Sequence, residues 1–213
     1  PLLNLRLVAD PLLRNAMAVY LCIPGLFIGV SLVAMLYLQN QLGMPAAQVG
    51  GLMLPWALAS FLAITLTGKS FNRLGPRPLL IAGCLLQGAG MLTLAQIDLA
   101  GQHALQIAAF ALMGFGGSLC SSTAQSSAFL QIPDGQLADA SALWNINRQL
   151  SFCLGVALLS LLLNLLLTVL PPAAAYRTCF ILAGASVFIP LLLCLRLANR
   201  AIVRQLNAQQ DAL

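Results

Sequence analysis

Charge is what this sequence has least of. Only 7% of its 213 residues are charged, with 10 Lys and Arg, 5 acidic residues and one His, while 60% are hydrophobic. An ordinary soluble domain carries about 25% charged residues. Little of the chain can therefore face water, and the composition predicts an integral membrane protein.

Several kinds of site are also missing. The six cysteines are scattered through apolar runs without a C-x-x-C pair, so neither a zinc site nor a disulfide framework is predicted. The formal charge of +5 comes without a basic patch and interleaved aromatics, so nucleic acid is not an expected partner. His103, the only histidine, has no acidic residue placed to orient it. We therefore expect no enzyme, no metal and no cofactor.

The start of the chain predicts a longer protein. Pro1 stands where a start methionine would, and no signal-peptide pattern follows it. We expect an excerpt or a processed piece.

Long uncharged runs predict six membrane-spanning helices that together form one domain. A bilayer core needs about 20 apolar residues of helix, and no charged residue lies between Arg14 and Lys69, for example. Glycine and proline separate the runs. The expected spans are 15–38, 46–67, 79–97, 104–129, 140–170 and 173–195, followed by a tail at 196–213. The fifth span is too long for one crossing, so its polar front, 140–149, is expected to extend beyond the hydrocarbon or to line a wet cavity.

The basic residues predict the orientation of these spans. Lys and Arg in short loops favour the cytoplasmic side of a membrane. One side of the predicted topology collects Arg6, Arg14, Lys69, Arg73, Arg77, Arg196, Arg200 and Arg204, with Arg148 nearby. The other side receives only Arg177. Both ends of the chain, including the tail, are therefore expected in the cytoplasm.

One basic stretch has a fixed spacing as well as charge. Between the second and third spans the pattern is G-x-x-x-N-R-x-G-x-R, formed by Gly68, Asn72, Arg73, Gly75 and Arg77. An orientation signal needs the charge but not the spacing. Glycine permits a tight turn, Asn can cap a helix end, and arginine can bond terminal carbonyls of neighbouring helices.

This stretch resembles the loop signature of the major facilitator superfamily, G-x-x-x-D-R-x-G-x-R-R. Asn72 stands where the family has an acid, and Pro78 where a second basic residue is common. In the family, the acid belongs to a charge network that latches two six-helix halves together. Asn72 cannot supply that ion pair, although it can still cap a helix.

Three further segments narrow the resemblance. Residues 1–17, 50–60 and 132–158 are similar to the C-terminal half of fourteen-span drug:proton antiporters of the QacA/EmrB type. The resemblance implies an all-α six-helix half of a transporter, with spans one, two, four and five around a central cavity and spans three and six outside. It also implies a missing N-terminal half, small-molecule substrates, protons, and a bacterial plasma membrane.

Candidate cavity or gate residues are polar and aromatic side chains of these inner spans. Ser118, Ser121, Ser122 and Gln125 share one helix face, as do Ser141, Asn145, Arg148 and Phe152, with Gln149 beside them. The candidates are Phe27, Trp56, Ser121, Gln125, Asn145, Arg148, Gln149 and Phe152. Alternatively, the polar residues pack helices together, Arg148 reaches toward the interface, and the aromatics anchor span ends. Every Asp lies near a span end, so a proton-coupling carboxylate is expected in the missing half.

Helix breakers and small residues mark places of bending and close contact. Pro24, Pro55 and Pro190 interrupt helical hydrogen bonding inside predicted spans. Gly25 and Gly29 predict a close-packing face. Two other functions stay open at this point: export of a metabolite or peptide by the same superfamily, and a non-transporting six-span scaffold.

Overall fold

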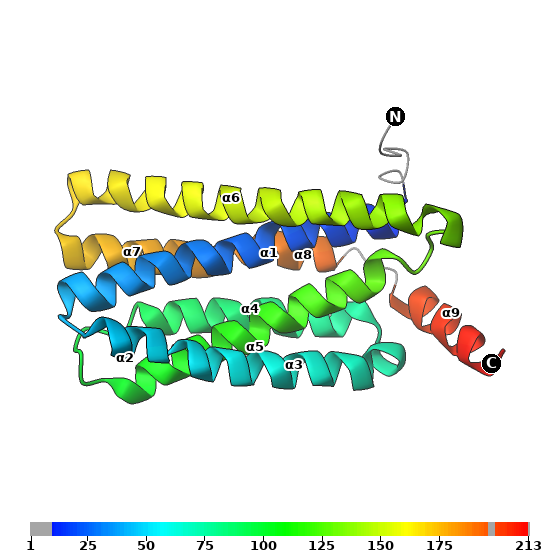
Figure 1. Cartoon of the computed structure of the whole chain (residues 1–213), viewed down its shortest axis with the longest axis horizontal. Helices are drawn as coiled ribbons and strands as arrows, with labels where there is room; N and C mark the ends of the chain where they lie inside the picture. Colours follow the sequence, from blue (N-terminus) through cyan, green and yellow to red (C-terminus); the bar gives the residue numbers. More distant parts are fainter. Residues whose placement is uncertain (1–9, 196–198, 213) are drawn as a thin grey trace.

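The computed structural model describes residues 10–195 and 199–212, and this part of the chain is helical without a strand. Six helical segments are long and apolar enough to cross a membrane. They lie roughly side by side in an elongated bundle (Figure 1). Arg6 and Arg196, two members of the predicted basic side, lie outside the described residues.

The first two spans are each built from two helical pieces. The first is α1 (Pro11–Leu36), which continues into a wider turn, η2 (Tyr37–Gln41). Asp10 caps α1, because its side chain accepts a hydrogen bond of 3.2 Å from the Leu12 N–H, and Pro11 fits the first helical position. The second span consists of α2 (Ala46–Gly51) and α3 (Met53–Leu74).

The remaining spans alternate in direction along the bundle (Figure 1). They are α4 (Pro76–Leu94), α5 (His103–Ala128), α6 (Leu137–Val169, after the short η3, Asp134–Gln136) and the pair α7 (Pro172–Ala185) and α8 (Phe188–Cys194). Amphipathic α9 (Asn199–Asp211) follows. We call the end of the bundle that carries the α3–α4 turn and α9 the α9 end.

The last span is broken where Pro190 removes a backbone donor. The in-helix acceptor for Pro190 would be the Ser186 carbonyl, and α7 stops just before Ser186 while α8 begins at Phe188. The Ser186 hydroxyl donates a hydrogen bond of 2.6 Å to the Ala183 carbonyl. The proline therefore divides this span into two pieces, as its position in the sequence predicts.

The turn between α3 and α4 is much shorter than the sequence suggests. The helix continues through Gly68, Asn72 and Arg73 to Leu74, and Gly75 alone separates it from α4. Gly75 has φ 78° and ψ 173°, a conformation that is open almost only to glycine. Most of the signature is therefore a helix end, not a loop.

Helix α9 holds this turn from outside. The Asn199 side chain accepts a hydrogen bond of 3.0 Å from the Arg77 N–H and donates one of 3.0 Å to the Leu74 carbonyl. It thereby satisfies one backbone group at the end of α3 and one at the start of α4. Ile202 and Leu206 of α9 are buried in the apolar cluster at this end.

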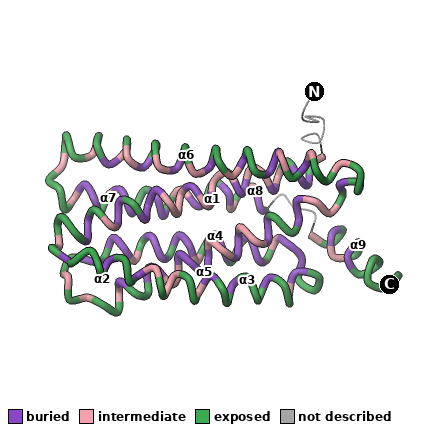
Figure 2. Tube along the Cα trace, viewed as in Figure 1, coloured by how far each residue is buried: buried purple, intermediate pink, exposed green. Residues whose placement is uncertain are grey.

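Burial is distributed unevenly over the spans. In the most apolar windows of α1, α4 and α5, at least half of the residues are buried, against 22% for the second span and 17% for the span that contains α6. Figure 2 shows long exposed stretches along α3 and α6. α1 and α5 thus form the centre of the bundle, and α3 and α6 present broad outer faces.

Replacing Gly75 by Ala tests the turn. Because Ala strains at this backbone conformation and its Cβ would meet the Asn199 side chain, Gly75→Ala should lower the free energy of unfolding by about 1 to 3 kcal/mol. Gly68→Ala is the control, since Gly68 is helical with open space around it, and this change should be neutral or stabilising by up to about 1 kcal/mol. Thermal unfolding in detergent measures both, and equal effects would contradict the assignment of the turn.

Candidate functional site

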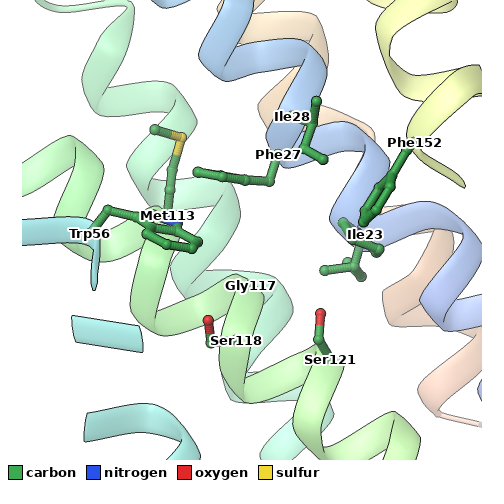
Figure 3. Close-up of a pocket in the computed structure, with 10 residues that line it drawn as sticks. Ile23, Phe27, Ile28, Trp56, Met113, Gly117, Ser118, Ser121 and Phe152 are labelled. Carbon is green, nitrogen blue, oxygen red and sulfur yellow. The ribbon is translucent and has the colours of Figure 1, made fainter. Parts of the chain in front are cut away.

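A cavity of about 250 Å³ lies between helices of the bundle (Figure 3). Its walls come from α1, α3, α5 and α6, the four helices to which the resemblance assigns the central cavity. The lining residues are Ile23, Pro24, Phe27, Ile28, Trp56, Met113, Gly117, Ser118, Ser121 and Phe152. The cavity therefore brings together four of the residues singled out in the sequence: Phe27, Trp56, Ser121 and Phe152.

An aromatic pair forms one wall of this cavity. Phe27 of α1 and Trp56 of α3 stack with ring centroids 5.1 Å apart and an interplanar angle of 17°. Phe152 of α6 and Met113 of α5 add further apolar surface (Figure 3). Such a wall can hold a flat apolar or cationic group by stacking and by cation–π attraction.

The polar part of the cavity is small and uncharged. Ser118 and Ser121 of α5 offer hydroxyl groups, and none of the described lining residues is ionisable. Gly117, next to Ser118 on α5, also lines the cavity. The cavity therefore offers shape, aromatic surface and hydrogen bonds, but no fixed charge.

Gln87 of α4 lies fully buried near this wall. Its side-chain nitrogen donates a hydrogen bond of 3.3 Å to the Ile23 carbonyl. Its side-chain oxygen has no hydrogen-bond partner among the described residues. A Cβ built on Gly117 would come within 2.8 Å of that oxygen. The third span thus contributes a polar group to the centre of the bundle, although it contributes no residue to the cavity lining.

One face of α6 fits closely against α1. A Cβ on Gly155 would strike the Gly25 backbone, and a Cβ on Gly29 would strike the Gly155 carbonyl. The predicted close-packing face of Gly25 and Gly29 is confirmed, and its partner is Gly155. We call the contact formed by Gly25, Gly29, Ser151 and Gly155 the α1–α6 seam.

Two buried polar residues of α6 bond the α1 backbone along this face. The Asn147 side-chain nitrogen donates a hydrogen bond of 2.8 Å to the Met17 carbonyl. The Ser151 hydroxyl accepts a hydrogen bond of 2.9 Å from the Gly25 N–H and donates one of 2.7 Å to the Leu21 carbonyl. Neither residue is among the candidates predicted from the sequence, although the four-residue spacing of Asn147, Ser151 and Gly155 places them on one helix face.

Arg148 extends beside this face onto an aromatic group of α1. Its Nε donates a hydrogen bond of 3.0 Å to the Tyr20 hydroxyl, and the guanidinium carbon lies 5.8 Å from the centre of the Tyr20 ring. Tyr20 in turn packs against Trp144, with centroids 4.6 Å apart. A hydroxyl and an aromatic face therefore hold this half-buried charge.

The other polar candidates lie elsewhere. Gln125 of α5 and the two amides Asn145 and Gln149 of α6 are exposed and do not line the cavity. In the signature, Asn72 and Arg73 are exposed, and in the described part of the chain neither side chain makes a hydrogen bond. The capping suggested for Asn72 is performed instead by Asn199.

Asn147 and its neighbour Asn145 form a matched pair for mutation. Asn147→Ala removes the bond to the Met17 carbonyl and should lower the free energy of unfolding by about 1 kcal/mol. Asn145→Ala removes an exposed amide, so it should change stability by less than about 0.5 kcal/mol. Unfolding of both variants in detergent measures the difference, and a larger loss at Asn145 would contradict the assigned contact.

Comparison with known proteins places the chain in a family. The Major Facilitator Superfamily model matches residues 2–156. The drug efflux pump JefA of Mycobacterium tuberculosis is 28% identical over 159 residues, which cover 75% of this chain and 31% of that protein. A multidrug resistance protein B homolog of the same species is 32% identical over 168 residues, 77% of this chain and 31% of the relative.

Related proteins also occur in other bacteria. The lincomycin resistance protein LmrB of Listeria monocytogenes is 26% identical over 157 residues, 74% of this chain and 33% of that protein. The aligned stretch thus spans about a third of the length of each of these relatives. With the matched model and the six apolar helices, these similarities identify an integral membrane protein: the chain belongs to the major facilitator superfamily.

Proposed function

We propose that this chain forms the C-terminal six-span half of a fourteen-span drug:proton antiporter of the QacA/EmrB type, which exports lipophilic or cationic small molecules. The observation that supports this most directly is the cavity between α1, α3, α5 and α6, with its stacked Phe27 and Trp56. Relatives named as a drug efflux pump and a lincomycin resistance protein point in the same direction.

The cavity favours a substrate with a flat hydrophobic body. Aromatic faces attract both apolar rings and cations, and a cation is attracted more strongly once water is excluded. Ser118 and Ser121 supply hydrogen bonds without binding one chemical group rigidly. Such a lining suits binding and release of varied lipophilic cations better than it suits one anionic metabolite.

Exposed amides of α5 and α6 support a partner half. Exposed amides cost free energy in hydrocarbon, and Gln125, Asn145 and Gln149 are all exposed in this chain alone. With 33 residues, α6 is about 50 Å long, whereas the hydrocarbon core is about 30 Å thick. We assign its N-terminal section, with Asn145, Arg148 and Gln149, to an inner gate at a water-filled opening between the two halves.

Proton coupling is assigned to the missing half. The acidic residues of this chain lie at or near helix ends, at Asp10, Asp98, Asp134, Asp139 and Asp211. A coupling group must titrate near the bound substrate, and none of these residues lines the cavity. This chain would then contribute one cavity wall and a latch, while the partner half contributes the carboxylate.

The α9 end is assigned to the cytoplasm of a bacterium whose plasma membrane holds the transporter. The described basic residues at this end are Arg14, Lys69, Arg73, Arg77, Arg200 and Arg204, and Arg177 lies near the opposite end. The positive-inside rule favours this orientation. α9 then forms part of a cytoplasmic tail, and the six predicted spans form a single transporter domain.

The aromatic pair provides the first test of transport. Trp56→Ala and Phe27→Ala should each raise the half-saturating concentration of an aromatic cation, such as ethidium, about tenfold, because one stacking face is lost. Efflux from cells that express the natural gene product measures this. The control is Phe61→Ala, also on α3 but 68% exposed and outside the cavity, and an equal effect there would contradict the assigned site.

The signature arginines provide the second test. The double change Arg73→Ala and Arg77→Ala should abolish efflux while the protein still inserts in the membrane, because the latch needs these two positions and not charge alone. Removing two positive charges nearby, with Arg200→Ala and Arg204→Ala, is the matched control and should leave efflux near normal. Normal efflux in the first variant would rule out the latch.

A further inference from the structure

Helix α1 loses regular backbone hydrogen bonding beside the cavity. Pro24 has no N–H, so the Tyr20 carbonyl has no donor from that position. The next donor is the Gly25 N–H, whose acceptor in a regular helix would be the Leu21 carbonyl. A break of this kind is costly in hydrocarbon, where no water replaces the missing partners.

A side chain of another helix bonds the α1 backbone directly beside this break. The Ser151 hydroxyl accepts the 2.9 Å hydrogen bond from the Gly25 N–H and donates the 2.7 Å hydrogen bond to the Leu21 carbonyl. It therefore bonds both of the groups that bond each other in a regular helix. Ser151 is 1% exposed. A side chain inserted into a helical ladder is one of the recognised causes of a bend.

The same contact is connected directly to the cavity lining. Pro24 and Phe27 lie on either side of Gly25, and Phe152 follows Ser151 on α6. Gly25 allows the two backbones to lie close together, because a Cβ at this position would strike the Ser151 carbonyl. A change in the path of α1 at this point, or in the α1–α6 distance, must therefore move Phe27 relative to Trp56 and Phe152.

We propose that Ser151 is a positioning residue of the transporter: its hydroxyl takes over the Gly25 and Leu21 hydrogen bonds at the Pro24 break and so sets the place of Phe27 in the substrate cavity. Only the transport measurement below rests on the proposed function. The hydrogen-bond exchange itself is a property of the bundle and can be measured without a substrate.

The substrate-free test is a double-mutant cycle with Pro24. Ser151→Ala should lower the melting temperature of the full-length protein in detergent, because Gly25 and Leu21 then lack a partner. In a Pro24→Ala background, a regular helix can restore the Gly25 to Leu21 bond, so Ser151→Ala should have less than half of that effect. Equal losses in both backgrounds would overturn the proposal.

Two further variants keep the test informative if Pro24→Ala does not fold. Ser151→Thr retains the hydroxyl and should keep most of the wild-type melting temperature. Ser160→Ala is the control on the same helix, since Ser160 has no hydrogen bond to another described helix, and it should have little effect. A loss at Ser160→Ala as large as that at Ser151→Ala would also overturn the proposal.

The transport measurement separates positioning from simple destabilisation. Ser151→Ala should raise the half-saturating concentration of ethidium about fivefold, the size expected for one lost hydrogen bond, with a nearly unchanged maximal rate per folded molecule. A lower maximal rate with unchanged half-saturation would overturn the positioning role. If the wild type exports no drug, the proposed function fails, and the melting cycle still decides the role of Ser151.

Discussion

The structure depends most on the need to pair every backbone group away from water. Inside a bilayer, an unpaired N–H or C=O group costs several kcal/mol, and a proline in a span creates such groups. Beside Pro24, Ser151 bonds the Gly25 N–H and the Leu21 carbonyl, and at the α3–α4 turn Asn199 bonds the Arg77 N–H and the Leu74 carbonyl. At both places, the side chain comes from a helix that lies far away in the sequence.

The close contact between α1 and α6 lies directly beside the cavity. The α1–α6 seam brings the two backbones so close that glycine is required at Gly25 and Gly155. Larger side chains directly beside the seam, Phe27 and Phe152, then point away from it into the space bounded by α3 and α5 (Figure 3). Close contact on one side of α1 thus leaves room on the other, where Trp56 supplies the opposing aromatic face.

The α9 end shows how a signature can be mostly helix and still be specific. Its glycines have different surroundings: Gly68 lies in open space inside α3, whereas Gly75 has a positive φ and is packed against α9. Spacing in the sequence predicted a turn and a possible cap at Asn72. The cap comes instead from Asn199, in a segment that the sequence analysis treated only as a tail, because nothing local indicates that α9 returns to the turn.

The sequence by itself determined the membrane setting, the number of spans and the family, because hydrocarbon requires long uncharged helices and the signature has a fixed spacing. It also indicated Phe27, Trp56, Ser121 and Phe152, whose residue types suit a cavity on inner spans. Only the tertiary structure decided that Asn147 and Ser151 face α1 while Asn145 and Gln149 remain exposed. The physical reason is that helical periodicity defines which residues share a face, whereas the partner of that face depends on contacts between segments more than 100 residues apart.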